Sequence, residues 1–162
     1  MKEYLEFDLS LAKMIATTMH SKGLTVSVSE SCTGGFISTF LTSVSGASRF
    51  FKGSFTTYSN VSKNQFLDIS NHDIDTYGVV SEEVVQAMAS NIRSKFNTDY
   101  GLATTGYVDK SNLQDTEILR AWIAIVSNNK IISECVFLDK NRLQNISKVS
   151  HELLNLFVKE IV

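Results

Sequence analysis

A strand that turns directly into a helix is the feature that most constrains the fold of this chain. Apolar Leu24, Val26 and Val28 alternate with polar residues at the two-residue period of a β-strand. The strand pattern ends at Glu30-Ser31-Cys32-Thr33-Gly34-Gly35, after which apolar residues recur at helical spacing over residues 36–41. A strand that runs through a small-residue turn into a helix is typical of α/β folds.

The rest of the chain contains further helix and strand patterns. An apolar stripe from Leu9 to Met19 predicts a first helix, with Asp8 or Ser10 as its cap and Gly23 as its stop. Helical spacing also predicts a short helix capped by Asn60, a helix that Ser81 caps and that reaches about Phe96, and a final helix from about Arg142. Residues 70–73 look like a polar turn. Strands are predicted at residues 50–58, 100–105, 119–127 and 131–138, the last two as a hairpin. We therefore expect an α/β fold, a three-layer α/β/α sandwich with a mixed sheet.

Composition favours one domain that binds a small molecule. The chain has 162 residues, of which 43% are apolar, and no repeat, linker or change of composition divides it. A single domain over residues 1–162 is the prediction. With 15 basic and 17 acidic residues the net charge is −2, so a dedicated nucleic-acid binder or membrane-surface binder is not expected.

Location and metal content are predicted from short segments. The longest apolar run, residues 121–126, is far shorter than a membrane helix, and the acidic residues 1–6 do not resemble a secretory signal, so we expect a cytoplasmic protein. The two cysteines, Cys32 and Cys135, form no C-x-x-C pair and have no clustered histidines. Neither a disulfide framework nor a metal site is expected.

The turn after the first strand is the first candidate site. Glycines let a ligand approach the backbone, and the amides of a helix's first turn can hold an anion or a developing oxyanion. In the alternative interpretation, Ser31 or Thr33 only caps the helix, and the glycines only permit tight packing. The segment itself leaves both interpretations open.

A serine nucleophile also needs a base. His20, His72 and His151 lie where surface or interface roles are expected, so they are weak candidates. Lys63 is the other candidate, provided that burial lowers its pKa enough to supply a neutral amine. A lysine in a short helix is more often solvated, and the sequence around Lys63 does not decide between the two roles.

Several motifs, taken together, resemble one family. They are E-S-C-T-G-G at residues 30–35, Gly46-Ala47-Ser48, Y-S-N-x-x-K at residues 58–63 and G-V-V-S-E-E at residues 78–83. Their order and spacing resemble the CinA C-terminal domain family over nearly the whole chain. The resemblance implies a nicotinamide-nucleotide amidase, which hydrolyses the carboxamide of nicotinamide mononucleotide to nicotinic acid mononucleotide and ammonia without metal or cofactor. It also implies a homo-oligomer, with a dimer favoured, and a small-molecule nucleotide as substrate.

The resemblance implies roles for individual residues. Ser31 would be the nucleophile, Lys63 its base, and Tyr58 a residue that orients or assists the pair. The expected substrate-binding residues are Thr33, Gly34, Gly35, Gly46, Ser48, Asn60, Thr105 and Arg142. Cys32 is the better intrinsic nucleophile, but in a strand-to-helix turn its side chain should point away from that of Ser31, and we favour Ser31.

One segment departs from the family pattern. After Gly106 the family usually has a loop rich in glycine and proline, whereas residues 107–120 contain neither. Residues with a Cβ atom cannot follow the same backbone path or let a ligand approach as closely. Two alternatives therefore stay open: a catalytically impaired nucleotide-binding or interaction module, and an amidase for another amide.

Overall fold

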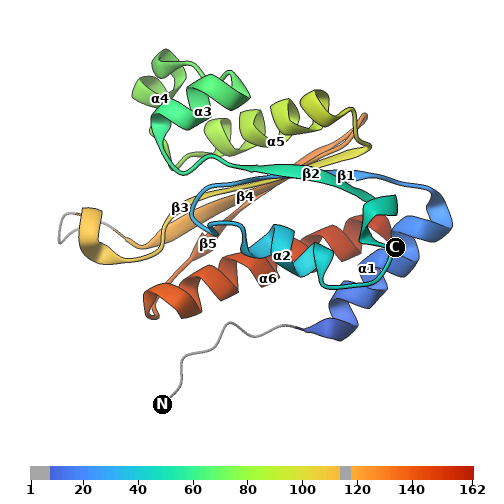
Figure 1. The fold of residues 1–162 in the computed structure, drawn as a ribbon. Coiled ribbons are helices and arrows are strands. Elements are labelled where there is room, and N and C mark those ends of the chain that lie inside the picture. The colour runs from blue at the N-terminus through green and yellow to red at the C-terminus, as the bar shows by residue number, and fades with distance from the viewer. Residues whose placement is uncertain (1–7, 114–117) are drawn as a thin grey trace.

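The computed structural model describes residues 8–113 and 118–162. The acidic start at residues 1–6 and part of the loop at 107–120 lie outside the described residues. Figure 1 shows a central sheet with helices on both faces, which confirms the predicted three-layer α/β arrangement.

The sheet is mixed, and its strands are ordered β2-β1-β3-β4-β5. β1 is parallel to both β2 and β3, whereas β4 is antiparallel to β3 and forms the predicted hairpin with β5. The carboxyl ends of β1, β2 and β3 therefore meet at one edge of the sheet. The strands span Val26–Glu30 (β1), Phe51–Thr56 (β2), Tyr100–Tyr107 (β3), Arg120–Val126 (β4) and Ile131–Phe137 (β5).

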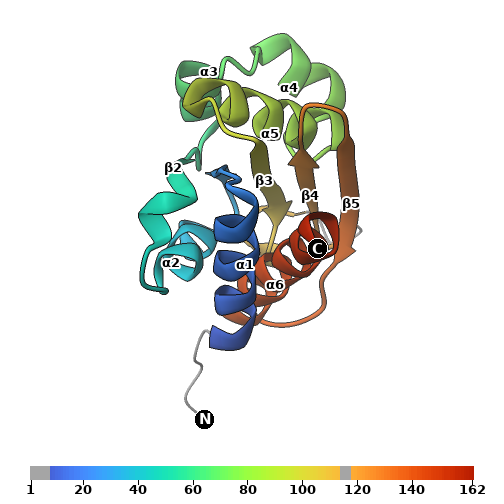
Figure 2. The ribbon, with the colours of Figure 1, turned by 90° about the vertical axis from the view of Figure 1, so that its right-hand side faces the viewer.

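The helices form two layers. One face of the sheet carries α1 (Leu9–Lys22), α2 (Phe36–Thr42) and α6 (Arg142–Ile161). The opposite face carries α3 (Asn60–Leu67), α4 (Asn71–Tyr77) and α5 (Glu82–Phe96). Figure 2, turned by 90°, shows α1 and α6 together on their side of the sheet. No helix in the described part of the chain is long and apolar enough to cross a membrane.

Side-chain caps fix where several helices begin. Ser81 caps α5 as predicted, because its side chain accepts a hydrogen bond from the Val84 amide. The cap of α3 is Ser59 rather than Asn60, since Ser59 and Ser62 form a reciprocal capping box. Residues 71–77 form a helix where a polar turn was expected at 70–73, because the side chain of Ser70 caps its first turn.

β1 is buried on both faces, although its alternation is typical of a half-buried strand. Its serines point toward the α5 layer, where the Ser27 hydroxyl donates to the Ile92 carbonyl over 3.2 Å. The position of β1 between β2 and β3, with helices on both faces of the sheet, explains the burial, and hydrogen bonds offset the cost of burying its hydroxyls.

Close packing of α5 on β3 depends on Gly101. A Cβ atom at this position would lie 2.1 Å from the Ala89 carbonyl oxygen, which belongs to the α5 backbone. Only glycine allows the helix to come this near to the strand. The contact holds α5 against the sheet near the amino ends of β1 and β3, where Gly101 pairs with Ser27.

Candidate active site

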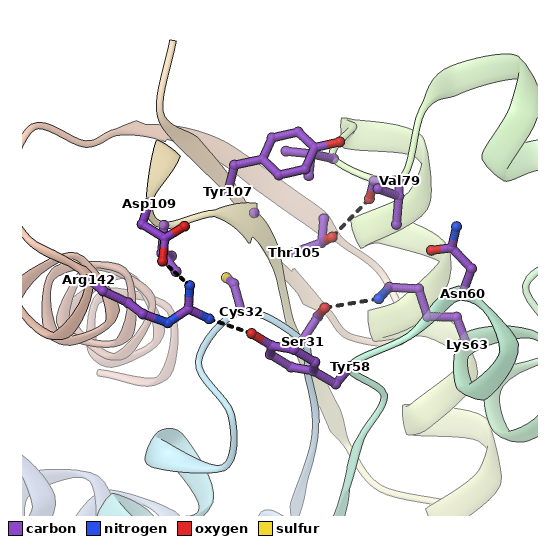
Figure 3. Close-up of a pocket in the computed structure, with 13 residues that line it drawn as sticks. Ser31, Cys32, Tyr58, Asn60, Lys63, Val79, Thr105, Tyr107, Asp109 and Arg142 are labelled. Atoms are coloured by element: carbon purple, nitrogen blue, oxygen red, sulfur yellow. Dashed lines mark hydrogen bonds and ion pairs between the residues drawn. The ribbon is translucent and has the colours of Figure 1, made fainter. Parts of the chain in front are cut away.

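A pocket of about 150 Å3 lies at the carboxyl ends of β1, β2 and β3. Ligands of open α/β sheets bind at this edge, because loops from neighbouring strands converge there. The segments after β1 and β2, the end of β3 and the loop after it, α3, the segment before α5 and the start of α6 supply its walls (Figure 3). The lining residues are Ser31, Cys32, Tyr58, Asn60, Lys63, Val79, Val80, Thr105, Gly106, Tyr107, Val108, Asp109 and Arg142.

Ser31 and Lys63 meet at the floor of this pocket. The Nζ atom of Lys63 lies 2.9 Å from the Oγ atom of Ser31 and donates a second hydrogen bond, of 2.8 Å, to the Thr57 carbonyl oxygen. The side chains come from two different elements, because Ser31 follows β1 and Lys63 lies in α3. Both residues are buried, with 7% and 1% of their surfaces exposed.

Burial controls the protonation of Lys63. Desolvation penalises the charged ammonium and lowers the pKa of Lys63 to about 8. No carboxylate forms an ion pair with it among the residues that the structure describes. With a pKa near 8, about a tenth of the side chain is a neutral amine at pH 7. Lys63 can therefore act as a base near neutral pH.

A buried carboxylate braces the turn that carries Ser31. Glu30 is fully buried and accepts hydrogen bonds of 2.6–3.1 Å. The donors are the amides of Gly35, Ile37 and Ser38 and the hydroxyls of Thr33 and Ser38. Negative charge at a helix N-terminus is favourable, because the unpaired amides and the helix dipole point toward it.

This brace corrects the expected oxyanion site. The Gly35 amide donates to Glu30, and the Gly34 amide donates to the Ser31 carbonyl over 3.1 Å. The first-turn amides of α2 are therefore already bonded and cannot hold an oxyanion while the brace is intact. The capping alternative also needs correction, since Glu30, rather than Ser31 or Thr33, caps this helix.

Five of the expected substrate-binding residues lie outside the pocket lining. Thr33 is buried and its hydroxyl bonds to Glu30. Gly34 and Gly35 form the turn, with φ angles of 61° and 100° that favour glycine. Gly46 and Ser48 lie before β2, where their carbonyls accept hydrogen bonds from His20 and Lys52.

Thr105 and Asn60 do line the pocket. The Thr105 hydroxyl donates to the Val79 carbonyl over 2.8 Å, which commits its proton and leaves its lone pairs as acceptors. Such an oxygen suits the N–H groups of a carboxamide. Asn60 is the first residue of α3 and lies at the pocket wall on the same side as Lys63.

Arg142 connects three segments at the pocket rim. It opens α6, and its guanidinium donates to the carboxylate of Asp109 and to the hydroxyl of Tyr58. Tyr58 was expected to orient the Ser31–Lys63 pair, but its hydroxyl bonds to Arg142 instead. More than half of the Tyr58 surface is exposed, so its ring lies at the entrance rather than the floor.

Cys32 also lines the pocket, but it is poorly placed to react. Only 4% of its surface is exposed, and burial raises the pKa of the thiol to about 12. The thiolate is the reactive form, so Cys32 is an inert thiol near neutral pH. Its side chain does not turn away from the pocket as expected, but lies between Arg142 and Ser31, apart from the Ser31–Lys63 contact (Figure 3). Neither a histidine in the lining nor a metal-binding cluster occurs among the described residues.

The roles of Glu30, Thr57 and Asp109 were not predicted from the sequence. An acidic residue between an apolar strand and a helix start was a usable signal for Glu30, because anions favour helix N-termini. Thr57 acts through its main-chain carbonyl, which no side-chain pattern reveals. Asp109 lies in the segment that departs from the family pattern, so the motifs carried no information about it.

Comparisons with known proteins agree on one family. The family model described as the CinA C-terminal domain matches residues 8–161. A CinA-like protein of Amoebophilus asiaticus is 33% identical over 153 residues, which cover 94% of this chain and 37% of the relative. A CinA-like protein of Flavobacterium psychrophilum is 35% identical over 158 residues, or 97% of this chain and 38% of the relative. This chain thus spans less than two fifths of the length of these relatives.

Solved structures share the fold. A competence/damage-inducible protein from Agrobacterium tumefaciens has a TM-score of 0.90 and 25% identity, and the match covers 98% of both chains. A competence damage-inducible protein from Klebsiella pneumoniae also has a TM-score of 0.90, at 21% identity, with 95% of this chain and 96% of that chain covered.

Proposed function

The chain belongs to the CinA C-terminal domain family, and on this premise we propose that it is an amidohydrolase whose nucleophile is Ser31 and whose base is Lys63. Its proposed substrate is the carboxamide of nicotinamide mononucleotide, and its products are nicotinic acid mononucleotide and ammonia. The observation that carries the proposal is the 2.9 Å contact between Lys63 Nζ and Ser31 Oγ inside a pocket.

The Thr57 carbonyl orients the amine for base catalysis. A neutral amine has two N–H bonds and one lone pair, and the carbonyl at 2.8 Å accepts one of the N–H bonds. The lone pair can then accept a hydrogen bond from the Ser31 hydroxyl and take its proton. In the protonated lysine the direction is the opposite, because the ammonium donates to the Ser31 oxygen. Lysine is thereby a base of fixed orientation, as a nucleophilic mechanism requires.

The reaction then proceeds in two steps. Ser31 Oγ attacks the amide carbon while Lys63 takes its proton; the resulting ammonium then protonates the leaving nitrogen, and ammonia departs. Water hydrolyses the acyl-enzyme with Lys63 again as base, which regenerates Ser31 and releases the acid. For the oxyanion we propose the Cys32 amide, which directly follows the nucleophile and has no main-chain partner among the described residues.

The size of the pocket fits the reacting end of a nucleotide. Pockets that enclose a drug-sized ligand usually measure roughly 300–1,000 Å3, whereas this pocket measures about 150 Å3. A pyridine ring with its carboxamide can enter toward Ser31, and the ribose and phosphate must lie nearer the rim. Arg142 is at that rim, and guanidinium groups bind phosphate well.

An ammonia-release assay with nicotinamide mononucleotide tests the proposal, with the Ser31→Ala variant as the control. Release by the parent and none by the variant is the expected result. Binding without release would instead favour the impaired nucleotide-binding module, for which the altered 107–120 segment is the motivating observation. Release from other carboxamides but not from the nucleotide would favour an amidase with a different substrate.

A further inference from the structure

The charges at the pocket rim bear on which substrates bind. Among the described lining residues, Arg142 is the one permanently charged cation and Asp109 is the one carboxylate. The two are paired, and the second arm of the guanidinium donates to Tyr58. The cation best suited to an anionic substrate group is therefore already bonded to protein groups.

Asp109 is held in place as a fixed negative charge. It caps the short helical turn at Lys110–Asn112, where its Oδ1 atom accepts a hydrogen bond of 3.0 Å from the Ser111 amide. Hydrogen bonds from Ser111 and then from Arg142 lower the pKa of Asp109 to about 2. The carboxylate is ionised at every pH at which the protein would be assayed.

The pair is open enough to exchange partners. The side chains of Arg142 and Asp109 are 44% and 31% exposed. Ion pairs in contact with water contribute little net free energy, so a phosphate that reaches the rim can displace Asp109 from Arg142. The displaced carboxylate nevertheless stays close by, because Ser111 still holds it, and it repels the phosphate.

We infer that Asp109 is a specificity-determining residue: it competes with the anionic group of the substrate for Arg142 and so weakens the preference for phosphate-bearing amides over phosphate-free ones. This inference rests on the proposed function, because it concerns the same pocket and assumes that the amide end of the substrate faces Ser31.

Two substrates that differ only in the phosphate isolate this effect. Nicotinamide mononucleotide and nicotinamide riboside share the pyridinium ring, the carboxamide and the ribose. Any contact of Asp109 with those shared groups therefore cancels in the ratio of their kcat/KM values. The measurement is this ratio, determined for the parent and for Asp109→Asn.

The Asn variant removes the charge and keeps the local structure. Asparagine caps helical turns as well as aspartate does, so the Ser111 contact can persist. The ratio should rise roughly tenfold in favour of the nucleotide, as expected when one like charge about 5 Å from a phosphate at a partly hydrated rim is removed. Asp68→Asn is the matched control, since Asp68 is also an exposed aspartate in an ion pair, with Lys95, but does not line the pocket; it should leave the ratio unchanged.

The outcomes separate the inference from the proposed function. An unchanged or lower ratio in Asp109→Asn, with both substrates hydrolysed, overturns the inference and leaves the function standing. If the parent hydrolyses neither compound, the function fails, and the same ratio is measured as binding affinities by calorimetry. A tenfold rise in that binding ratio still supports the inference, whereas an unchanged ratio, or no binding by either protein, overturns it.

Discussion

Lys63 Nζ and Ser31 Oγ lie 2.9 Å apart, although the two residues are 32 positions apart in the chain. The register of two parallel strands brings them together. Glu30 pairs with Thr56 at the ends of β1 and β2, and the Thr57 amide donates to the Glu30 carbonyl over 2.8 Å. The residues that follow each strand therefore emerge side by side, and the Thr57 carbonyl reaches the amine of Lys63.

Replacing Ser31 should remove activity, while replacing Cys32 should not. We expect Ser31→Ala to lower kcat for amide hydrolysis by at least about a thousandfold, because the proposed acyl-enzyme forms on the Ser31 hydroxyl. Cys32→Ser should retain most of the parent activity, since the thiol is protonated and buried. Steady-state release of ammonia measures both variants. Comparable rates for Ser31→Ala and the parent would exclude Ser31 as the nucleophile.

The rate should depend on pH through Lys63. The base must be neutral, so kcat/KM should rise about tenfold per pH unit below the Lys63 pKa of about 8 and level off above it. Lys63→Arg should be inactive at every pH, because a guanidinium stays protonated. A pH–rate profile of parent and variant checks this. A rate that is independent of pH between 6 and 9 would contradict a lysine base.

The sequence predicted the layers better than the details of the site. Period-two strands and helical stripes located the strands of the sheet and the helices that cover it. They did so because an element that buries one face repeats its apolar residues at the period of that element. The helix at residues 71–77 was missed, since it buries only Ile74 and its polar residues gave no stripe. The Ser70 side chain caps the helix, but a serine makes the same contact in a turn, so Ser70 alone does not distinguish the two structures.

The sequence predicted site residues that contribute side chains better than site residues that contribute main-chain amides. Ser31, Lys63, Thr105 and Arg142, whose roles the family resemblance implies, all line the pocket; the roles themselves stay predictions. Gly34 and Gly35 were expected to bind substrate with their amides, but the Glu30 side chain folds back onto that turn. Which of several possible acceptors an amide finds is settled by packing, and no single-sequence pattern specifies it.

Burial of Lys63 should make stability depend on pH. The folded pKa of Lys63 is about 8, below its ordinary value of 10.5, so the unfolded chain binds the proton more tightly and burial destabilises the fold at neutral pH. Stability should therefore rise with pH between about 8 and 10.5. Relative to Lys63→Met, the parent should gain about 3 kcal/mol in the free energy of unfolding between pH 7 and pH 10.5. Urea unfolding at both pH values measures the difference, and equal values would show an unperturbed lysine.

Glu30→Gln should destabilise the fold and slow the reaction together. The carboxylate accepts hydrogen bonds on both oxygens: from Thr33, Gly35 and Ile37 on one, and from the amide and hydroxyl of Ser38 on the other. Whichever way the glutamine amide is turned, its NH2 group faces at least two donors. We expect a loss of about 2–5 kcal/mol in the free energy of unfolding, or roughly 5–15 °C in Tm.

Comparison with an exposed glutamate separates the brace from a general charge effect. Glu83 lies in the first turn of α5, and Glu83→Gln should shift Tm by only about 1–3 °C, because its charge is solvated. If Glu30 fixes the nucleophile turn, Glu30→Gln should also lower kcat at temperatures where the variant is fully folded, with a smaller change in KM. Differential scanning calorimetry and steady-state kinetics measure the two effects. A folded Glu30→Gln variant with normal kcat would show that the brace serves stability and does not position Ser31.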